Sequence, residues 1–182
     1  RWLGLPVMAL GLASGALHRP PDLFVSGDAR LVGVVAGGGM WLQRQSGASA
    51  LTRDSWLRAH GLAEARALPG QGEEASIACT PGACRLRPLP GGPEAMLLRG
   101  DAPADHCGRV ALVVSAEPLR GRCGGSQVID RFSVWRHGPH AAWFEAAGVR
   151  VVSDRAWRGA RPWVPPMPVP RGREDAPPAP VE

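Results

Sequence analysis

Histidines and carboxylates that could bind a metal ion or transfer a proton are present, but without the spacing of a known catalytic motif. The chain has five histidines: His18, His60, His106, His137 and His140. None belongs to an H-x-H-x-D-H or H-E-x-x-H string, and no G-x-S-x-G string occurs. His137 and His140 could supply two metal ligands or a base, because only two residues separate them. Since no acidic residue or cysteine adjoins them, we interpret them as ordinary polar residues at the start of a predicted helix.

Aspartates lie at or just after the ends of three predicted strands, at Asp28, Asp130 and Asp154. Carboxylates at strand ends can be catalytic, but aspartate is also among the commonest turn residues. The glycine run 37–39 lacks the Lys-Ser/Thr pair that completes a phosphate-binding loop. These patterns predict no cofactor and no metal ion, and they identify no small-molecule substrate.

The four cysteines could form disulfides, a zinc site or free thiols. Cys79 and Cys84 face each other across a predicted hairpin, within disulfide reach, while Cys107 and Cys123 flank a predicted strand. A structural zinc site normally uses C-x2-4-C pairs, whereas here one pair is C-x4-C and the other has fifteen intervening residues. We therefore favour disulfides, which indicate an oxidising compartment, although four cysteines permit three pairings.

Basic charge is concentrated in the second half of the chain. All 21 basic residues are arginine, and residues 109–161 hold nine of them against four acidic residues. Such an excess could favour phosphate contacts, but arginine-rich solvated surfaces are also typical of GC-rich coding. No stretch shows the alternation of aromatic residues and arginine that is typical of single-strand binding. We expect four tryptophans to fill the core and fix the chain end: Trp135, Trp143, Trp157 and Trp163.

Apolar runs and turn residues predict many short strands and two helices. The expected strands are 22–26, 31–35, 40–44, 76–79, 84–86, 95–99, 110–115, 127–130, 132–135 and 149–153. The expected helices are 52–62, with Thr52 as a possible cap, and 139–148, with Pro139 at its start and Gly148 at its end. Hairpins followed by strand–helix–strand predict an α/β (α+β) domain of layered β-sheets.

Three segments differ in composition. Residues 1–19 begin with an apolar run that lacks an initiator Met, and we expect them to be the end of a transmembrane helix that begins upstream. A signal peptide and a buried core helix are the alternatives. Residues 22–164 are long enough for one domain with a core. Residues 165–182 are so rich in proline that we expect a disordered tail.

The order of these segments resembles the C-terminal, metallo-β-lactamase-like region of the ComEC family of competence proteins, which are membrane channels for DNA internalisation. DLFVSGDARLVGVVAGGGMWLQ is similar to the opening strand, turn and hairpin of that region, with Ser26-Gly27-Asp28 at the turn. Further similar segments are ALVVSAEPLRGRC, VIDRFSVWRHGPHAAWFEAAG, VRVVSD and RPWVP. The cysteine arrangement CTPGAC, HC and GRC resembles that of the alphaproteobacterial branch.

The chain departs from this family at the metal ligands. Nuclease-competent members carry H-x-H-x-D-H after the opening hairpin, where this chain has SGASALTRDSWLRAHG, with only Asp54 and His60. A two-metal hydrolase needs several converging ligands. The resemblance therefore implies a degenerate metallo-β-lactamase-like fold that is not an enzyme.

The function implied is that of a non-catalytic periplasmic domain of a DNA-uptake channel in the bacterial inner membrane. Its partners would be DNA and the membrane, and the candidate phosphate contacts are Arg120, Arg122, Arg131 and Arg136. One alternative is a residual metal-dependent phosphodiesterase or nuclease that uses His137, His140 and Asp130 or Asp154. Another is a disulfide-stabilised envelope domain that only packs on its own membrane helices.

Overall fold

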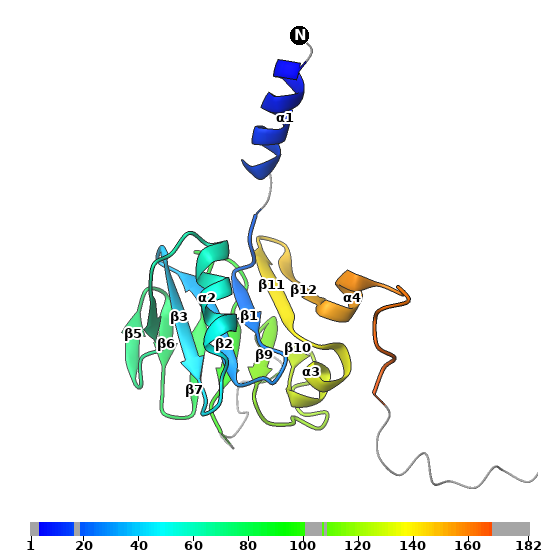
Figure 1. The fold of residues 1–182 in the computed structure, drawn as a ribbon. Coiled ribbons are helices and arrows are strands. Elements are labelled where there is room, and N and C mark those ends of the chain that lie inside the picture. Colours follow the sequence, from blue (N-terminus) through cyan, green and yellow to red (C-terminus); the bar gives the residue numbers. More distant parts are fainter. Residues whose placement is uncertain (1–3, 17–18, 101–106, 108, 169–182) are drawn as a thin grey trace, which may run out of the picture.

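The computed structural model describes residues 4–16, 19–100, 107 and 109–168 of the 182-residue chain, and they form a mixed α/β fold with two six-stranded sheets (Figure 1). The first sheet has the order β12 (Gly148–Ser153), β11 (His140–Glu145), β1 (Leu23–Val25), β2 (Leu31–Ala36), β3 (Gly39–Arg44) and β4 (Ala65–Ala67). All its neighbours are antiparallel except the pair β3 and β4.

The second sheet has the order β10 (Gln127–Ile129), β9 (Leu112–Ser115), β8 (Ala95–Leu98), β7 (Ala83–Leu86), β6 (Ile77–Cys79) and β5 (Gly72–Glu74). Strands β8, β9 and β10 are parallel, whereas β5 to β8 form an antiparallel meander. All four residues of β9 are buried, as the continuous apolar run predicts for a strand covered on both faces. The short edge strands β4 and β5 were not expected.

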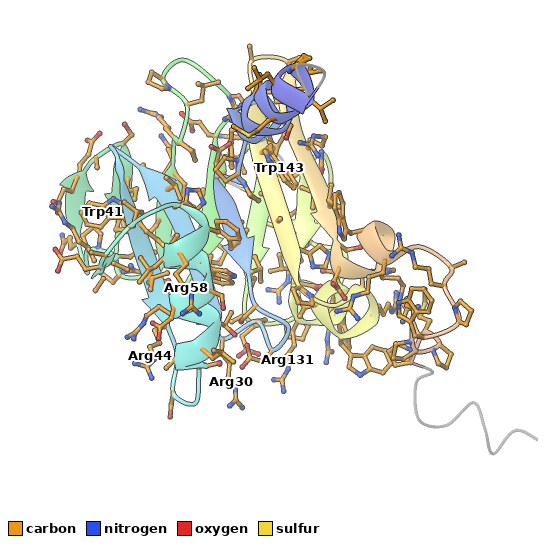
Figure 2. The ribbon with its side chains drawn as sticks, turned by 45° about the horizontal axis from the view of Figure 1, so that its top comes forward. Arg30, Trp41, Arg44, Arg58, Arg131 and Trp143 are labelled. Atoms are coloured by element: carbon orange, nitrogen blue, oxygen red, sulfur yellow. A yellow bond between two sulfur atoms is a disulfide. The ribbon has the colours of Figure 1, made fainter. Side chains whose placement is uncertain are left out.

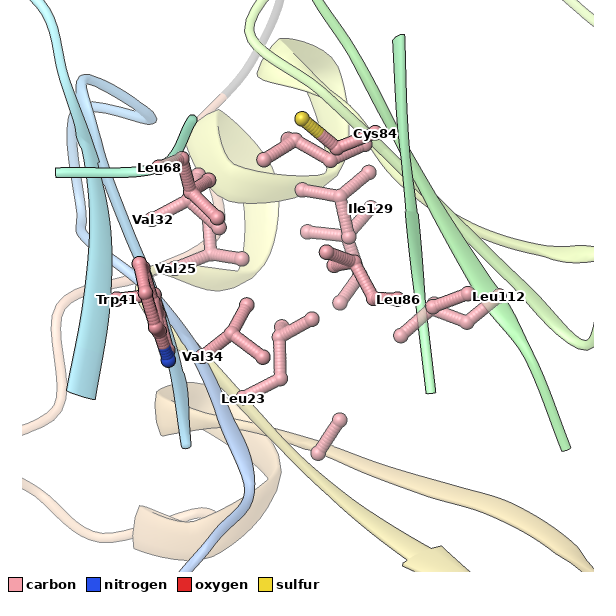
Figure 3. Packing of buried hydrophobic residues seen from close by; sticks show 14 of the residues in the cluster. Leu23, Val25, Val32, Val34, Trp41, Leu68, Cys84, Leu86, Leu112 and Ile129 are labelled. Carbon is pink, nitrogen blue, oxygen red and sulfur yellow. The ribbon is translucent and has the colours of Figure 1, made fainter. Parts of the chain in front are cut away.

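The main core lies between the two sheets, because each contributes the inward-facing alternate residues of its strands (Figure 3). The first sheet supplies Leu23, Val25, Val32, Val34 and Trp41, and the second supplies Cys84, Leu86, Leu112 and Ile129. Most of these side chains are fully buried. The arrangement is a sandwich whose two inner faces share one apolar layer.

Helix α2 (Ala50–Ala59) covers the outer face of the first sheet. Leu57 and Trp56 of this helix pack on a second apolar cluster: Phe24, Leu31, Met40 and Leu42. Gly33 of β2 permits this close approach, because a Cβ atom there would lie 3.0 Å from the Trp56 ring. The N-cap is Ser49, whose Oγ accepts from the Thr52 backbone N–H, so the prediction that Thr52 caps the helix is wrong.

Two disulfides join the four cysteines. Cys79 and Cys84 are bonded across the β6–β7 hairpin, where they are directly paired, and Cys107 is bonded to Cys123. The second bond lies over the outer face of the second sheet, in an apolar cluster with Val110 and Leu119. There is no free cysteine in the part of the chain that the structure describes.

Two predicted elements are of the wrong type. Residues 132–135 belong to helix α3 (Arg131–His137) instead of a strand, because Asp130 caps that helix. Residues 139–148 contain strand β11 instead of a helix, because β11 pairs with β1 on one side and β12 on the other. Tertiary pairing here overrides a local pattern that favours helix. Helix α4 (Asp154–Arg158) follows β12.

Helix α1 (Gly4–Ala16) extends away from the sandwich in Figure 1, and its apolar side chains Leu5, Val7, Met8 and Leu10 are exposed. Within the described residues, no helix has both the length and the apolar character needed to cross a bilayer. Residues 165–168 are in no helix or strand, and the remainder of the predicted tail, 169–182, lies outside the described residues. His18 and His106 also lie outside them.

Candidate functional site

One end of the sandwich collects the buried polar side chains. Ser26 follows β1, Ser115 ends β9, Asp130 follows β10 and His140 begins β11, and all four are buried. They lie at one end because α3 connects the carboxyl end of β10 to the start of β11, which pairs with the end of β1. We call this the α3 end, which is defined by the β1–β2 turn, the carboxyl ends of β3, β9 and β10, and helix α3.

Asp130 is held entirely by hydrogen bonds that build the local structure. Its Oδ1 accepts from the backbone N–H of Ser133 at 2.9 Å and from the Ser133 hydroxyl at 2.9 Å, and its Oδ2 accepts from the Leu119 N–H at 3.0 Å. The Ser133 hydroxyl in turn accepts from the Asp130 N–H, which completes a capping box. Burial raises the pKa of Asp130, but these hydrogen bonds outweigh it and hold the pKa below its ordinary value.

Replacing Asp130 by alanine is expected to lower the free energy of unfolding by about 2–3 kcal/mol, since a helix cap is lost and the Leu119 N–H loses its acceptor. Because the folded pKa is depressed, the carboxylate stabilises the fold above about pH 4, and this contribution disappears as the pH falls through the folded pKa. Urea unfolding of both proteins between pH 7 and pH 2.5 measures the difference. A difference that stays constant over this range would contradict the assignment.

Asp28 closes the β1–β2 turn. Its Oδ1 accepts from the Ser26 hydroxyl at 2.5 Å and from the Arg30 N–H at 3.0 Å, while the Ser26 Oγ accepts from the Leu31 N–H at 2.9 Å. Partial burial raises the pKa of Asp28, but the Ser26 hydrogen bond and the contacts with Arg30 outweigh this effect. The pKa therefore lies below its ordinary value. Of the two interpretations of an aspartate after a strand, catalytic residue or turn residue, these contacts support the turn residue.

The histidines do not converge with carboxylates into a metal centre. His140 is buried, its Nδ1 has no hydrogen-bond partner, and burial together with nearby His137 lowers its pKa, against the Gly138 carbonyl that raises it. Asp154 lies close by, since its N–H donates to the Pro139 carbonyl, but its carboxylate is paired with Arg158 at 2.9 Å. Among the described residues, no three histidines, cysteines or carboxylates are placed to hold a metal ion together.

The two residues that replace the H-x-H-x-D-H string lie elsewhere, on and just after α2. Asp54 pairs with its neighbour Arg53 at 2.8 Å. His60 packs edge-on against Phe24, with ring centroids 5.4 Å apart, and burial lowers its pKa although the Pro21 backbone and Asp22 raise it. No described contact connects Asp54 or His60 to the buried polar residues at the α3 end.

Arginines occupy the α3 end instead. A depression of about 220 Å³ is lined by Ser115, Glu117, Arg120 and Arg122, and a second of about 460 Å³ is lined by Arg120, Ser133, Arg136 and His137. Arg120 borders both, and Arg131 is the first residue of α3. The four predicted phosphate contacts are therefore brought together, all exposed. None forms an ion pair with a carboxylate among the described residues.

Two further arginines of this end were missed by the sequence analysis. Arg30 lies in the β1–β2 turn, and Arg44 ends β3, directly opposite Leu31 in the sheet register. Figure 2 shows Arg30, Arg44 and Arg131 at the same side of the molecule. Arg30 and Arg44 also have no ion-paired carboxylate within the described part. Both lie at the open end of the β2–β3 hairpin, and the pairing of β1 with β11 brings α3 to that same end.

The tryptophans correct another expectation. Trp135, Trp157 and Trp163 are exposed and do not fill the core. Trp143 is partly buried, donates its indole N–H to the Arg19 carbonyl at 3.0 Å, and is stacked by Arg150 at 4.0 Å. Trp143 and Trp157 line a groove of about 700 Å³ on the outer face of the first sheet, between α2 and α4.

Comparisons with known proteins provide no relative from which a function could be inferred, so the inference depends on the residues of the site. No protein-family model, curated protein or solved structure matches this chain. The expected kinship with ComEC proteins therefore stays a prediction. At the α3 end the structure places a set of exposed arginines that form no ion pair among the described residues, next to polar residues that are engaged in local hydrogen bonds.

Proposed function

We propose that this chain is a non-catalytic domain of a ComEC-type DNA-uptake channel, and that its α3 end holds DNA through arginine–phosphate contacts. The observation behind the proposal is that six exposed arginines at this end form no ion pair with a carboxylate among the described residues: Arg30, Arg44, Arg120, Arg122, Arg131 and Arg136. Uncompensated guanidinium groups are well suited to bind phosphates, since they present several donors and a permanent charge. The nearby carboxylate Asp130 serves as a helix cap, which favours a binding role over hydrolysis.

The arrangement of the chain supports a membrane-bound domain. Strand β1 begins near the segment that follows α1 and ends at the α3 end, so α1 and the α3 end lie at opposite ends of the sandwich (Figure 1). If α1 belongs to a membrane helix, the arginines face away from the bilayer, where DNA would approach. Two layered sheets with α2 outside are compatible with a degenerate metallo-β-lactamase-like domain. The two disulfides favour the periplasmic side of a bacterial inner membrane.

The first test of the proposal is the salt dependence of DNA binding. We expect a labelled 20-base-pair duplex to bind the full chain at low salt, with an affinity that falls steeply with salt and varies little with sequence. Replacing Arg120, Arg122, Arg131 and Arg136 by alanine is expected to reduce the log–log salt slope by about 3.6, because each of the four lost phosphate contacts removes about 0.9. Fluorescence anisotropy between 25 and 300 mM NaCl measures both quantities.

A matched variant separates site-specific contacts from net charge. Replacing Arg66, Arg85, Arg87 and Arg150 removes the same charge from arginines that pair with carboxylates elsewhere on the fold. We expect this variant to keep most of the slope. Equal losses in the two variants, or no binding at 25 mM NaCl, would argue against the proposed site. Cleavage of the duplex in Mn²⁺ or Zn²⁺, with stoichiometric metal in the protein, would instead support the residual nuclease.

A further inference from the structure

Exposed aromatic side chains are confined to one region of the described fold. The exposed fractions of Phe132 and Trp135 are 45% and 44%, and those of Trp157 and Trp163 are 75% and 71%. The other five described aromatic rings are buried or partly buried. Large exposed aromatic groups are unfavourable in water unless they meet a partner, so their restriction to one region suggests a binding surface.

Helix α3 explains why this surface was not evident in the sequence. In a strand, Phe132 and Trp135 would point to opposite faces because their separation is odd. In the helix that the structure contains, residues three apart share a face, and both rings are exposed. Arg131 and Arg136 belong to the same short helix, and Phe132 lines the depression that Arg120 and Arg136 border. Helix α3 therefore carries two exposed aromatic rings and two arginines.

Hydrogen bonds join α3, α4 and the segment after α4. The Arg155 guanidinium donates to the Arg136 carbonyl at 3.3 Å and to the carbonyls of Pro165 and Pro166 at 2.9 and 3.2 Å. In the same segment the Arg161 guanidinium lies 5.8 Å from the centre of the Trp163 ring. Residues 131–168 contain six arginines and only two carboxylates. We call the group Phe132, Trp135, Trp157 and Trp163, with Arg131, Arg136 and Arg161, the aromatic–arginine surface.

We propose that the aromatic–arginine surface binds single-stranded nucleic acid, with unpaired bases stacked on its aromatic rings and phosphates bound by its arginines. This inference rests on the proposed function for the phosphate contacts, and it adds the strand state of the ligand. Every base has a π-face that an aromatic side chain can cover, and a duplex hides these faces in its own stack. The positive charge of residues 131–168 complements a polyphosphate backbone.

The position of the surface favours a nucleic acid over a lipid bilayer. Helix α3 lies at the end of the sandwich opposite α1, whose exposed apolar side chains are the part of the fold that suits a membrane. A bilayer in contact with α1 would therefore be far from α3. A lipid surface remains one outcome of the experiment, which includes a vesicle arm.

The experiment compares oligo(dT)20 with a 20-base-pair duplex for the full chain and for a variant in which all four aromatic residues are alanine. We expect the variant to lose at least about 10-fold in affinity for oligo(dT)20, with an unchanged salt slope and little change for the duplex. Binding of oligo(dT)20 should also quench the intrinsic fluorescence of the wild-type protein, whose emission comes from tryptophan because the chain has no tyrosine.

Controls distinguish stacking from general loss of apolar surface or of folding. Leu51→Ala removes an apolar side chain that is 72% exposed on α2, and it should leave binding unchanged. Trp157→Phe and Trp163→Phe should retain most of the affinity that Trp157→Ala and Trp163→Ala lose, because phenylalanine can still stack. Circular dichroism melting reports whether each variant folds, and the single variants replace the quadruple one if it does not.

The outcomes separate this inference from the proposed function. Failure of both DNAs to bind at low salt would overturn the proposed function and this inference with it. Equal binding of both DNAs, unaffected by the aromatic substitutions, would overturn only the stacking surface. A quadruple variant that loses binding to phosphatidylglycerol vesicles but keeps its affinity for oligo(dT)20 would assign the surface to lipid instead.

Discussion

Removing both disulfides is expected to lower the free energy of unfolding by about 5 kcal/mol, a large part of the 5–15 kcal/mol that is typical of a domain. The Cys107–Cys123 bond closes a loop with a sequence separation of 16, for which loop entropy predicts about 3 kcal/mol. The Cys79–Cys84 bond, with a separation of 5, is expected to contribute about 2 kcal/mol.

The loop closed by the Cys107–Cys123 bond also covers an apolar surface. Val110, Leu119 and Cys123 cover Met96, Leu98 and Val113 on the outer face of the second sheet. No described helix packs there, whereas α2 covers the corresponding face of the first sheet. The disulfide therefore restrains the segments that shield this apolar face from water. Its loss is expected to expose the face to water as well as to remove the covalent constraint on the chain.

Two double variants separate the contributions. Cys79 and Cys84 are replaced by alanine in one, Cys107 and Cys123 in the other, and urea unfolding is measured with and without a reducing agent. We expect the reducing agent to destabilise the wild-type protein and each double variant, which keeps one bond, but to leave unchanged a third variant in which all four cysteines are alanine. Wild-type stability that is insensitive to complete reduction would contradict the stabilising role.

Local signals predicted most of the sheets. The Thr80–Ala83 turn between two short apolar runs identified the β6–β7 hairpin, and the run that includes Leu112–Ser115 identified a strand buried on both faces. The failures concern segments whose state depends on distant partners. Pro139 and Gly148 are good helix boundaries, yet the residues between them form β11 because β1 and β12 both pair with it.

Some residues of the candidate site could likewise be predicted from the sequence, whereas others depended on the fold. Arg120, Arg122, Arg131 and Arg136 could be chosen from charge density alone, and the structure brings them to one end. Arg30 and Arg44 could not be assigned to the site without the pairing of β1 with β11, which brings α3 to the open end of the β2–β3 hairpin. The exposed rings of α3 required the correct element type. Composition thus predicted the positive charge of the site, whereas its exposed aromatic side chains became evident only in the structure.

Replacing Phe144 by alanine is expected to cost about 3–5 kcal/mol, because its ring is fully buried between the two sheets and a cavity would remain. Trp143 has a larger side chain, but it lies on the opposite face of β11 and is only partly buried. We therefore expect Trp143→Ala to cost less than Phe144→Ala, although it also removes the indole hydrogen bond to the Arg19 carbonyl.

This order depends on the alternation of a strand, in which neighbouring side chains point to opposite faces. Urea unfolding of the two variants, with Glu145→Ala as an exposed control on the same strand, measures it. A greater loss in Trp143→Ala would mean that the inward face of β11 is misassigned. The register of β11 also sets the position of His140 opposite Val25 and, through α3, of the arginines beside it. The stability order of two adjacent residues therefore tests the geometry on which the proposed nucleic-acid surface depends.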